Sequence, residues 1–141
     1  MIALDTNVIV RFLVRDDEKQ AQAVYARFRQ AEAARERLFV PLLVVLETIW
    51  VLESAYDLSR DDILDAFEDL RRMPILEFEK DHLLQSLLSS GRKSRADLSD
   101  ALIALSAEES GCLSGITFDK KASKAAFFRL LKRKALLPAD H

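Results

Sequence analysis

Four acidic side chains stand where a carboxylate is either structural or a ligand for a divalent cation. Asp5 ends the apolar opening MIALD, and Glu47 interrupts the apolar segment VPLLVVLETIWVL. Asp100 and Asp119 occur later, in LSDALI and TFDKK. Oxygen ligands favour Mg²⁺ or Mn²⁺ over zinc, and a bound cation offsets the repulsion between crowded carboxylates. If the fold gathers these side chains, they form an acidic metal pocket.

The aspartates also have an ordinary structural explanation. Asp5 and Asp119 each precede an expected helical turn, where an aspartate accepts hydrogen bonds from orphan amide groups. Asp97 and Asp100 are three residues apart in DLSD, which resembles a capping box with Asp97 at the N-cap. The same spacing places both carboxylates on one face of a helix. Seen singly, each aspartate is explained by capping; seen together, they favour a shared site.

Glu47 is the most informative of the four, because its sequence neighbours are almost all apolar. A carboxylate in such surroundings is costly unless it is paired or binds a metal. The alternatives are a buried salt bridge or a solvent-facing stripe shared with Glu53. Trp50 and Tyr56 are expected in the core rather than on a surface that stacks nucleic-acid bases.

Short apolar strands alternate with helices along the chain. We expect strands over residues 2–5, 38–41, 75–78 and 113–118. Hydrophobic periodicity predicts helices over 6–14, 17–35, 42–55, around 63–70, around 83–88 and over 98–111, followed by a basic helical stretch. Such alternation is typical of an α/β protein, here a three-layer α/β/α fold with a short central parallel sheet flanked by helices.

In a fold of this kind, sites lie beyond the carboxyl ends of the parallel strands. Asp5 follows the first predicted strand and Asp119 follows the fourth, so both are expected on the same rim. Gly115 stands inside the fourth strand and weakens that prediction slightly, because glycine is a poor strand former.

The composition describes one ordinary domain. Half of the 141 residues are hydrophobic, fewer than a third are charged, and the formal net charge is −2. We expect a single domain over 1–137 with a tail at 138–141. One cysteine, Cys112, allows no internal disulfide and, with two histidines, argues against structural zinc. We find no signal peptide, and the apolar segment 40–52 is shorter than the ~20 residues that span a bilayer; a cytoplasmic protein without membrane contact is expected.

Four segments in register resemble the PIN domain family, and more closely its VapC-type toxins, the ribonuclease halves of VapBC toxin–antitoxin pairs. They are LDTNVIVRFL (4–13), LETIWVL (46–52), ADLSDALIALSAEESGC (96–112) and TFDKKA (117–122). The resemblance extends from residue 1 to about residue 137. It implies catalytic and metal-binding roles for four acids and an accessory role for a fifth: Asp5, Glu47, Asp100 and Asp119, with Asp97. Thr6 or Asn7 is expected to orient Asp5 or a metal-bound water, and Thr117, two residues before Asp119, is expected to act likewise. The alternative for all three is ordinary turn and cap chemistry.

The resemblance implies a Mg²⁺- or Mn²⁺-dependent endoribonuclease. In this hypothesis a metal-activated water hydrolyses RNA phosphodiester bonds and leaves a 5′-phosphate and a 3′-hydroxyl. One alternative is a PIN-fold module that binds RNA or protein without catalysis, although all four expected acids are present. A phosphatase of the haloacid-dehalogenase kind is a weaker alternative, because that fold needs a second Asp where this chain has Asn7.

Two basic clusters flank the expected rim and could contact RNA phosphates. Their best-placed members are Arg92, Lys93, Arg95, Lys120, Lys121 and Lys124, and the second cluster continues through Lys134. The alternative is an ordinary solvated basic face. The apolar stripe of helix 17–35, with Tyr25 and Phe28, belongs either to the core or to a groove for a partner. By resemblance, the expected partners are a cognate VapB-type antitoxin and a second copy in a homodimer.

Overall fold

The structure is a computed structural model that describes residues 1–132. The expected tail at 138–141 and the basic residues Arg133 and Lys134 lie outside these residues. The elements are β1 (Ile2–Ala3), α1 (Thr6–Leu13), α2 (Glu18–Ala34), β2 (Leu38–Val40), α3 (Leu42–Ser54), α4 (Arg60–Arg71), β3 (Leu76–Phe78), α5 (Asp81–Ser90), α6 (Leu98–Glu109), β4 (Gly115–Thr117), the 3₁₀ turn η1 (Ala122–Lys124) and β5 (Phe128–Leu130). None of the described helices is long and apolar enough to cross a membrane.

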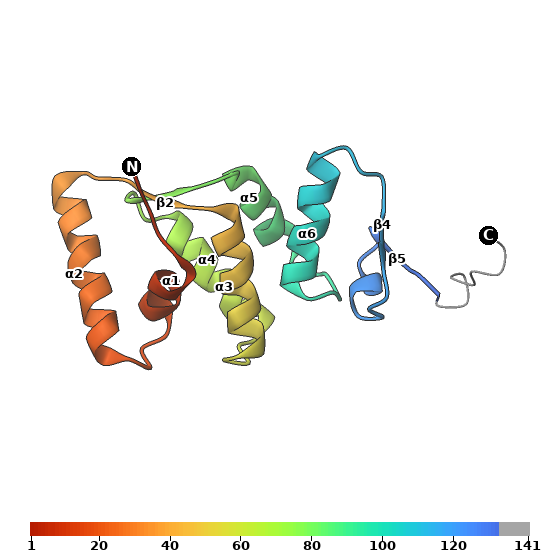
Figure 1. Ribbon diagram of the computed structural model, residues 1–141, viewed down its shortest axis with the longest axis horizontal. Helices are drawn as coiled ribbons and strands as arrows, with labels where there is room; N and C mark the ends of the chain where they lie inside the picture. The colour runs from red at the N-terminus through yellow and green to blue at the C-terminus, as the bar shows by residue number, and fades with distance from the viewer. Residues whose placement is uncertain (133–141) are drawn as a thin grey trace, which may run out of the picture.

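The strand pairs are all parallel, and they are divided between two sheets where one was expected. β1, β2 and β3 lie side by side in that order, with Ala3 opposite Phe39. β4 pairs with β5 in a separate two-stranded sheet. The predicted α/β fold with parallel strands is confirmed, but the described chain has two parts. We call residues 1–109 the core unit and residues 115–132 the arm; Figure 1 shows the arm beyond α6, at the far end from α2.

The hydrophobic core lies inside the core unit, between the three-stranded sheet and the helices around it. α1 packs against α2 and α3, while α6 packs against α3 and α5. Large side chains that are almost fully buried come from several of these helices, among them Ile9, Ile49, Phe67 and Leu84. Phe28 of α2 is also buried and stacks at a tilt on the Phe12 ring. The apolar stripe of α2 is therefore core.

Local signals in the sequence explain where most helices begin. Asp17 Oδ1 accepts a hydrogen bond from the Gln20 amide and caps α2, and Ser59 caps α4 in the same way. α3 starts after Pro41, which has no capping side chain. Glu79, distant in sequence, takes the place of a capping residue, because its Oε1 accepts a hydrogen bond from the Leu42 amide at 2.8 Å. The starts of α2, α3 and α4 each thus have a side-chain acceptor for an amide group that has no partner within the helix.

The arm differs from its sequence-based prediction. The basic stretch after Asp119 was expected to be helical, and that prediction is wrong: it forms only the short turn η1 and then the strand β5. The strand is explained by its pairing, because Arg129 lies opposite Ile116 in a parallel ladder with β4. Gly115 is also explained, since a Cβ there would come within 2.8 Å of the Phe127 ring. The glycine lets an aromatic ring pack directly on the strand backbone.

Candidate acidic site

Asp5 combines a structural role with an exposed position beyond β1. Its Oδ1 accepts a hydrogen bond from the Val8 amide at 3.1 Å and caps α1. The next residue, Thr6, is buried, and its hydroxyl donates to Glu47 Oε1. Thr6 therefore positions the carboxylate of Glu47, whereas the resemblance implied a role beside Asp5 or a metal-bound water.

Glu47 is exposed, not buried among its apolar neighbours. α3 carries apolar residues on all sides, and the face that is left uncovered contains Leu43, Glu47 and Trp50 at helical spacing. The prediction that Trp50 belongs to the core is wrong: its side chain is 59% exposed. Glu47 therefore needs no buried partner to explain it, and its carboxylate is open to solvent and to ligands.

A groove between α3 and α6 connects Glu47 with Asp100. It has a volume of about 390 Å³ and apolar walls that include Leu46 and Ile103. Glu47 and Asp100 both line it, together with Trp50. The two acidic residues are 53 positions apart in sequence, and the packing of α6 against α3 brings them to the same groove.

The start of α6 is capped by an unexpected residue. Asp97 occupies the N-cap position, as the capping-box pattern predicted, but its side chain makes no capping hydrogen bond. Glu53 caps the helix from α3: its Oε2 accepts from the Leu98 amide at 2.9 Å and its Oε1 from the Ser99 hydroxyl at 3.0 Å. Asp97 instead forms an ion pair with Lys121 of the arm, with 2.7 Å between Nζ and Oδ1.

Asp100 lies in the most acidic surroundings of the candidate site. Burial raises the pKa of its carboxyl above the usual range. Three neighbouring carboxylates raise that pKa further: Asp97, Asp119 and Glu53. The ammonium group of Lys121 opposes them. The beginning of α6 is therefore a point where negative charge accumulates and where a cation would be stabilised.

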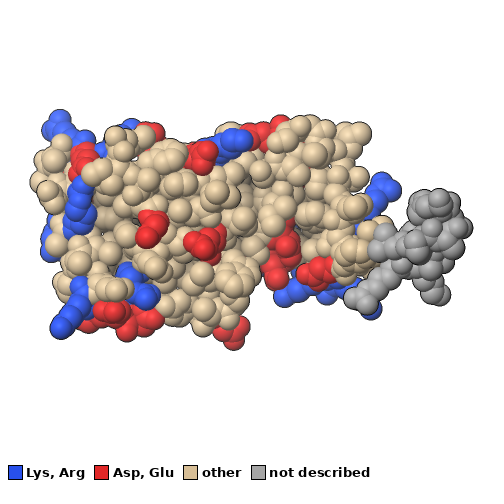
Figure 2. Space-filling view, viewed as in Figure 1, with Lys and Arg blue, Asp and Glu red and all other residues tan. Residues whose placement is uncertain are grey.

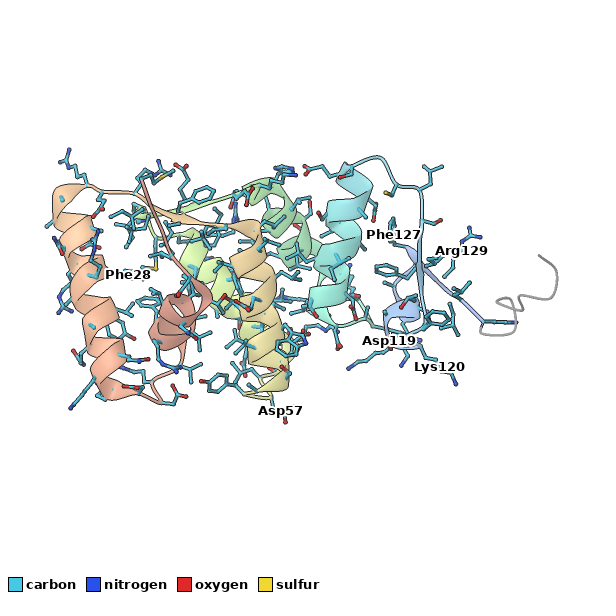
Figure 3. The ribbon with its side chains drawn as sticks, viewed as in Figure 1. Phe28, Asp57, Asp119, Lys120, Phe127 and Arg129 are labelled. Carbon is cyan, nitrogen blue, oxygen red and sulfur yellow. The ribbon has the colours of Figure 1, made fainter. Side chains whose placement is uncertain are left out.

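Asp119 belongs to the arm and follows β4, as predicted. Its backbone amide donates to Thr117 Oγ1 at 3.0 Å, and its Oδ1 accepts from the Lys121 amide at 2.8 Å. Thr117 and Asp119 thus form a polar turn that leads into η1. Figure 3 shows Asp119 and Lys120 together at one end of the arm. The influence of Asp119 on the Asp100 pKa places these two acids in the same neighbourhood.

The elements that carry the acids follow one another along the molecule in Figure 1, with α1 and α3 first, then α6 and then the arm, so the acids form a row and not a closed pocket. Figure 2 shows separate acidic patches crossing the middle of one face. Asp5 and Asn7 border another hollow, of about 280 Å³, on the α1–α2 side. Within residues 1–132, no three Asp, Glu, His or Cys side chains come close enough together to hold a metal ion. The donors are of the right type for Mg²⁺ or Mn²⁺, but one chain in this arrangement does not gather them.

The basic residues proposed for RNA contact fall into two groups. Arg92 is bound by acids of α4: its guanidinium lies 2.8 Å from Asp61 Oδ1 and 2.6 Å from Asp65 Oδ1. Lys121 is paired with Asp97. The other four are exposed and take part in no ion pair within the described part of the chain: Lys93, Arg95, Lys120 and Lys124. These four are the better candidates for phosphate contacts.

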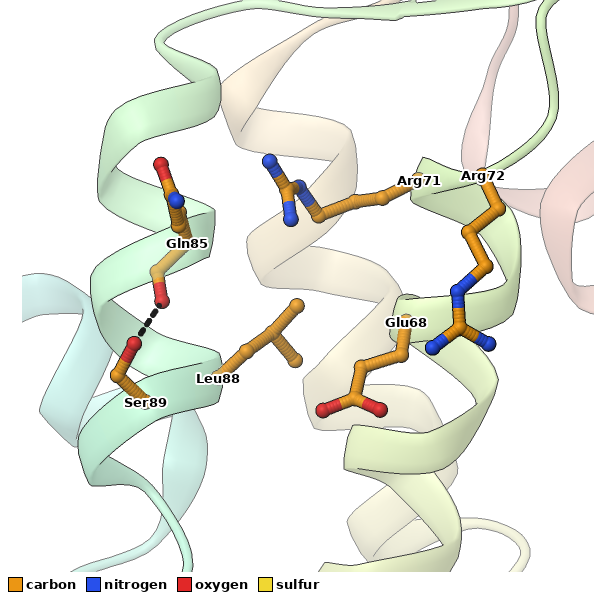
Figure 4. A pocket seen from close by; sticks show the side chains of 6 residues that line it. All are labelled: Glu68, Arg71, Arg72, Gln85, Leu88 and Ser89. Atoms are coloured by element: carbon orange, nitrogen blue, oxygen red, sulfur yellow. Dashed lines mark hydrogen bonds between the residues drawn. The ribbon is translucent and has the colours of Figure 1, made fainter.

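A pocket between α4 and α5 has a different character. Its volume is about 420 Å³, and none of the candidate acids lines it. Figure 4 shows its walls, which are Glu68, Arg71, Arg72, Gln85, Leu88 and Ser89. Arg71 is already bound in a two-pronged ion pair with Asp81, at 2.7 and 2.9 Å. The Arg71–Asp81 pair thus joins the end of α4 to the start of α5.

Glu53 was not recognised from the sequence as part of the acidic region. It stands six residues after Glu47, and the only available signal was the stripe that the two share on the helix. Its contact with the start of α6 depends on the packing of two helices whose sequences are more than 40 residues apart. No local pattern reports such a contact.

The family model for the PIN domain matches residues 2–128. The chain therefore belongs to the PIN domain family, and the resemblance drawn from its motifs is confirmed. It is similar to a VapC ribonuclease from Aquifex aeolicus (strain VF5), with 26% identity over 127 residues. The aligned region covers 90% of this chain and 93% of that protein.

Proposed function

We propose that this protein is a VapC-type endoribonuclease that needs Mg²⁺ or Mn²⁺. The observation that carries the proposal is the combination of family membership with the groove that Glu47 and Asp100 line, where Asp97 and Asp119 add negative charge around Asp100. The residues to which we assign the site are Asp5, Glu47, Asp100 and Asp119, with Asp97 as an accessory. The similarity to a VapC ribonuclease supports cleavage of RNA in particular.

The side chains around these acids have separate tasks in this proposal. Thr6 fixes Glu47 through its hydroxyl, and Thr117 fixes the turn that carries Asp119. Lys120 and Lys124 stand close to Asp119 in sequence and are exposed, so they can neutralise phosphates of a bound strand. We assign to Asn7, which is exposed beside Asp5, the task of orienting Asp5 or a metal-bound water.

The partners follow from the same similarity. We propose an RNA substrate, a VapB-type antitoxin that covers the acidic row, and a second copy of this chain. An antitoxin that carries a basic side chain would satisfy the negative charge around Asp100 in the absence of substrate.

Cleavage of a mixed RNA pool tests the proposal. The purified protein is incubated with Mg²⁺, Mn²⁺ or EDTA, beside Asp100→Asn and the matched surface variant Asp69→Asn, which lies on α4 away from the row. We expect metal-dependent cleavage that Asp100→Asn abolishes and Asp69→Asn leaves unchanged. A folded protein that binds RNA but cleaves none with either metal would instead be a non-catalytic PIN-fold module.

A further inference from the structure

The arm is joined to the core unit by few contacts. Residues 110–114, which lead from α6 to β4, are all exposed, and Gly111 among them has a positive φ of 94°. Of the arm residues 115–132, only Ala122 is buried. Within residues 1–132, the Lys121–Asp97 ion pair is the one polar contact between the arm and the core unit. The position of the arm therefore depends on Lys121 and Ala122.

Lys121 contacts two of the candidate acids, one on each side of this junction. Its backbone amide donates to Asp119 Oδ1 at 2.8 Å, and its ammonium nitrogen lies 2.7 Å from Asp97 Oδ1. The first contact lies within the arm, and the second reaches the residue that immediately precedes α6. One residue thus connects the turn that carries Asp119 with the helix that carries Asp100.

The charges around Lys121 explain why a cation is needed at this junction. Burial and three neighbouring carboxylates raise the pKa of the Asp100 carboxyl, and the ammonium group of Lys121 opposes them. Asp119 is one of these carboxylates and the only one on the arm. Like charges repel, so the acids at the start of α6 push Asp119, and with it the arm, away from the helix. A positive charge among them lets Asp119 stay near Asp100.

The neighbouring lysines of the arm have different surroundings. Lys120 and Lys124 are exposed and take part in no ion pair within the described part of the chain. Their ammonium groups are open to an incoming phosphate, whereas that of Lys121 is occupied by Asp97. Three lysines within five positions therefore divide into two kinds.

We propose that Lys121 is a positioning residue, which holds Asp119 of the arm beside Asp100 of α6 and does not contact the RNA. An exposed ion pair contributes little to global stability, but the arm has little else to hold it. A displacement of about 1 Å at a reacting group can lower a rate by about 100-fold. The placement of the arm is argued from these contacts alone; its effect on cleavage rests on the proposed ribonuclease function.

Spin labels measure the position of the arm without any need for activity. In a Cys112→Ser background, labels are attached at Ile103→Cys on α6 and at Arg129→Cys on β5, both of which are exposed positions. Double electron–electron resonance then gives the distribution of distances between the two labels. With Lys121 in place, we expect one narrow distribution.

Three variants of the labelled protein test the role of the ammonium group. Lys121→Met removes the charge and keeps the length of the side chain, and it should broaden the distribution and shift it to longer distances. Lys121→Arg keeps the charge and should restore the narrow distribution. The matched control Lys120→Met removes the same charge one residue away and should leave the distribution narrow. An unchanged distribution in Lys121→Met would overturn the proposal.

Kinetics separate positioning from RNA binding. The constants kcat and KM are measured on a labelled RNA oligonucleotide that the wild type cleaves. Lys121→Met should lower kcat by about 10- to 100-fold with little change in KM, and Lys121→Arg should restore most of the loss. Lys120→Met and Lys124→Met should instead raise KM and keep most of kcat. A raised KM with unchanged kcat in Lys121→Met would make Lys121 a phosphate contact and overturn the proposal.

The labels and the kinetics distinguish failure of this proposal from failure of the ribonuclease function. If the wild type cleaves no RNA and Lys121→Met still displaces the arm, the ribonuclease is rejected and the positioning of Asp119 stands. If the wild type cleaves RNA and Lys121→Met displaces the arm without loss of kcat, the role in cleavage is rejected. Urea unfolding of Lys121→Met should give the wild-type midpoint; a large global loss would mean that Lys121 serves folding and would overturn the proposal.

Discussion

The core unit and the arm are stabilised in different ways. Within residues 1–132, all the buried hydrophobic side chains except Ala122 lie between Leu4 and Ala104. The arm instead exposes Phe118 by 56% and Leu130 by 39%, and it is held by one short ladder and by its contact with α6. Segments with little buried apolar area open at low free-energy cost. Because the candidate acids are divided between the two parts, activity should depend on the arm, whereas global stability should not.

The largest expected contrast comes from truncating one phenylalanine in each part. Phe67→Ala empties a site that is 2% exposed in the middle of the core, and we expect the free energy of unfolding to fall by about 3–5 kcal/mol. Phe118→Ala removes a ring that lies mainly in solvent, and we expect a change of about 0.5 kcal/mol or less in the monomer. Urea unfolding followed by circular dichroism at low protein concentration measures both. Similar losses in the two variants would mean that the arm shares the core.

The glycines give a contrast of intermediate size. A Cβ at Gly91 would lie 2.6 Å from the Leu87 carbonyl oxygen and close to Leu98, so Gly91→Ala should lower global stability by about 1–3 kcal/mol. Gly115→Ala would drive a Cβ into the Phe127 ring. We expect it to open the arm while the unfolding midpoint of the core unit stays the same.

Amide hydrogen exchange separates these two glycine effects. In Gly115→Ala, the Leu131 amide, which donates to Thr117 across the arm ladder, should lose its protection while amides of α3 keep theirs. In Gly91→Ala, protection should fall throughout the core unit. Loss of protection in both parts on Gly115→Ala would contradict the division.

The core unit was largely predictable because its signals are local. Asp5 at the end of β1 and the periodic apolar residues of α2 and α4 report their own elements without any knowledge of the rest of the chain. The uncovered face of α3 was not predictable, since a helix that is apolar on every side does not reveal which side its neighbours leave open. Trp50 was therefore expected in the core, and for Glu47 a buried salt bridge and a solvent-facing stripe were both left open.

The arm was less predictable because its structure depends on pairing between segments. The residues after Asp119 include alanines, leucines and lysines, which favour a helix locally. The ladder between β4 and β5 overrides that preference, as tertiary context often does. The acids were expected on one rim of a single sheet, and the structure places them along two sheets instead. Local sequence does not report which strands are neighbours, because that depends on contacts between distant segments. The roles of the individual acids remain predictions.

Glu53 and Asp97 are the two candidates for capping α6, and replacing them should lower stability by different amounts. Glu53→Gln weakens the hydrogen bonds to the Leu98 amide and the Ser99 hydroxyl, and we expect a loss of about 1–2 kcal/mol. Asp97→Asn should cost little, because Asp97 occupies the N-cap without bonding an amide. Thermal unfolding of both variants at pH 7 measures the two losses and shows which residue caps α6. A larger loss from Asp97→Asn would restore the capping box that the sequence pattern indicated.

The smallest expected effect is the pH-dependent contribution of one ion pair to the stability of the core unit. The guanidinium of Arg71 binds Asp81 through two hydrogen bonds and holds the pKa of that carboxyl below its usual value. A depressed folded-state pKa stabilises the protein above the unfolded value of about 3.9, and that contribution is lost as the pH falls through the folded-state pKa. Both side chains are partly in solvent, so the contribution is at most about 1 kcal/mol.

Denaturant unfolding at pH 7 and near pH 3 should therefore show a smaller acid-induced loss of stability in Asp81→Asn than in the wild type. The matched variant Asp69→Asn, whose carboxylate is mostly exposed beside Arg72, should follow the wild type. An Asp81→Asn protein that lost as much stability in acid as the wild type would show that the Arg71–Asp81 pair contributes nothing measurable to stability.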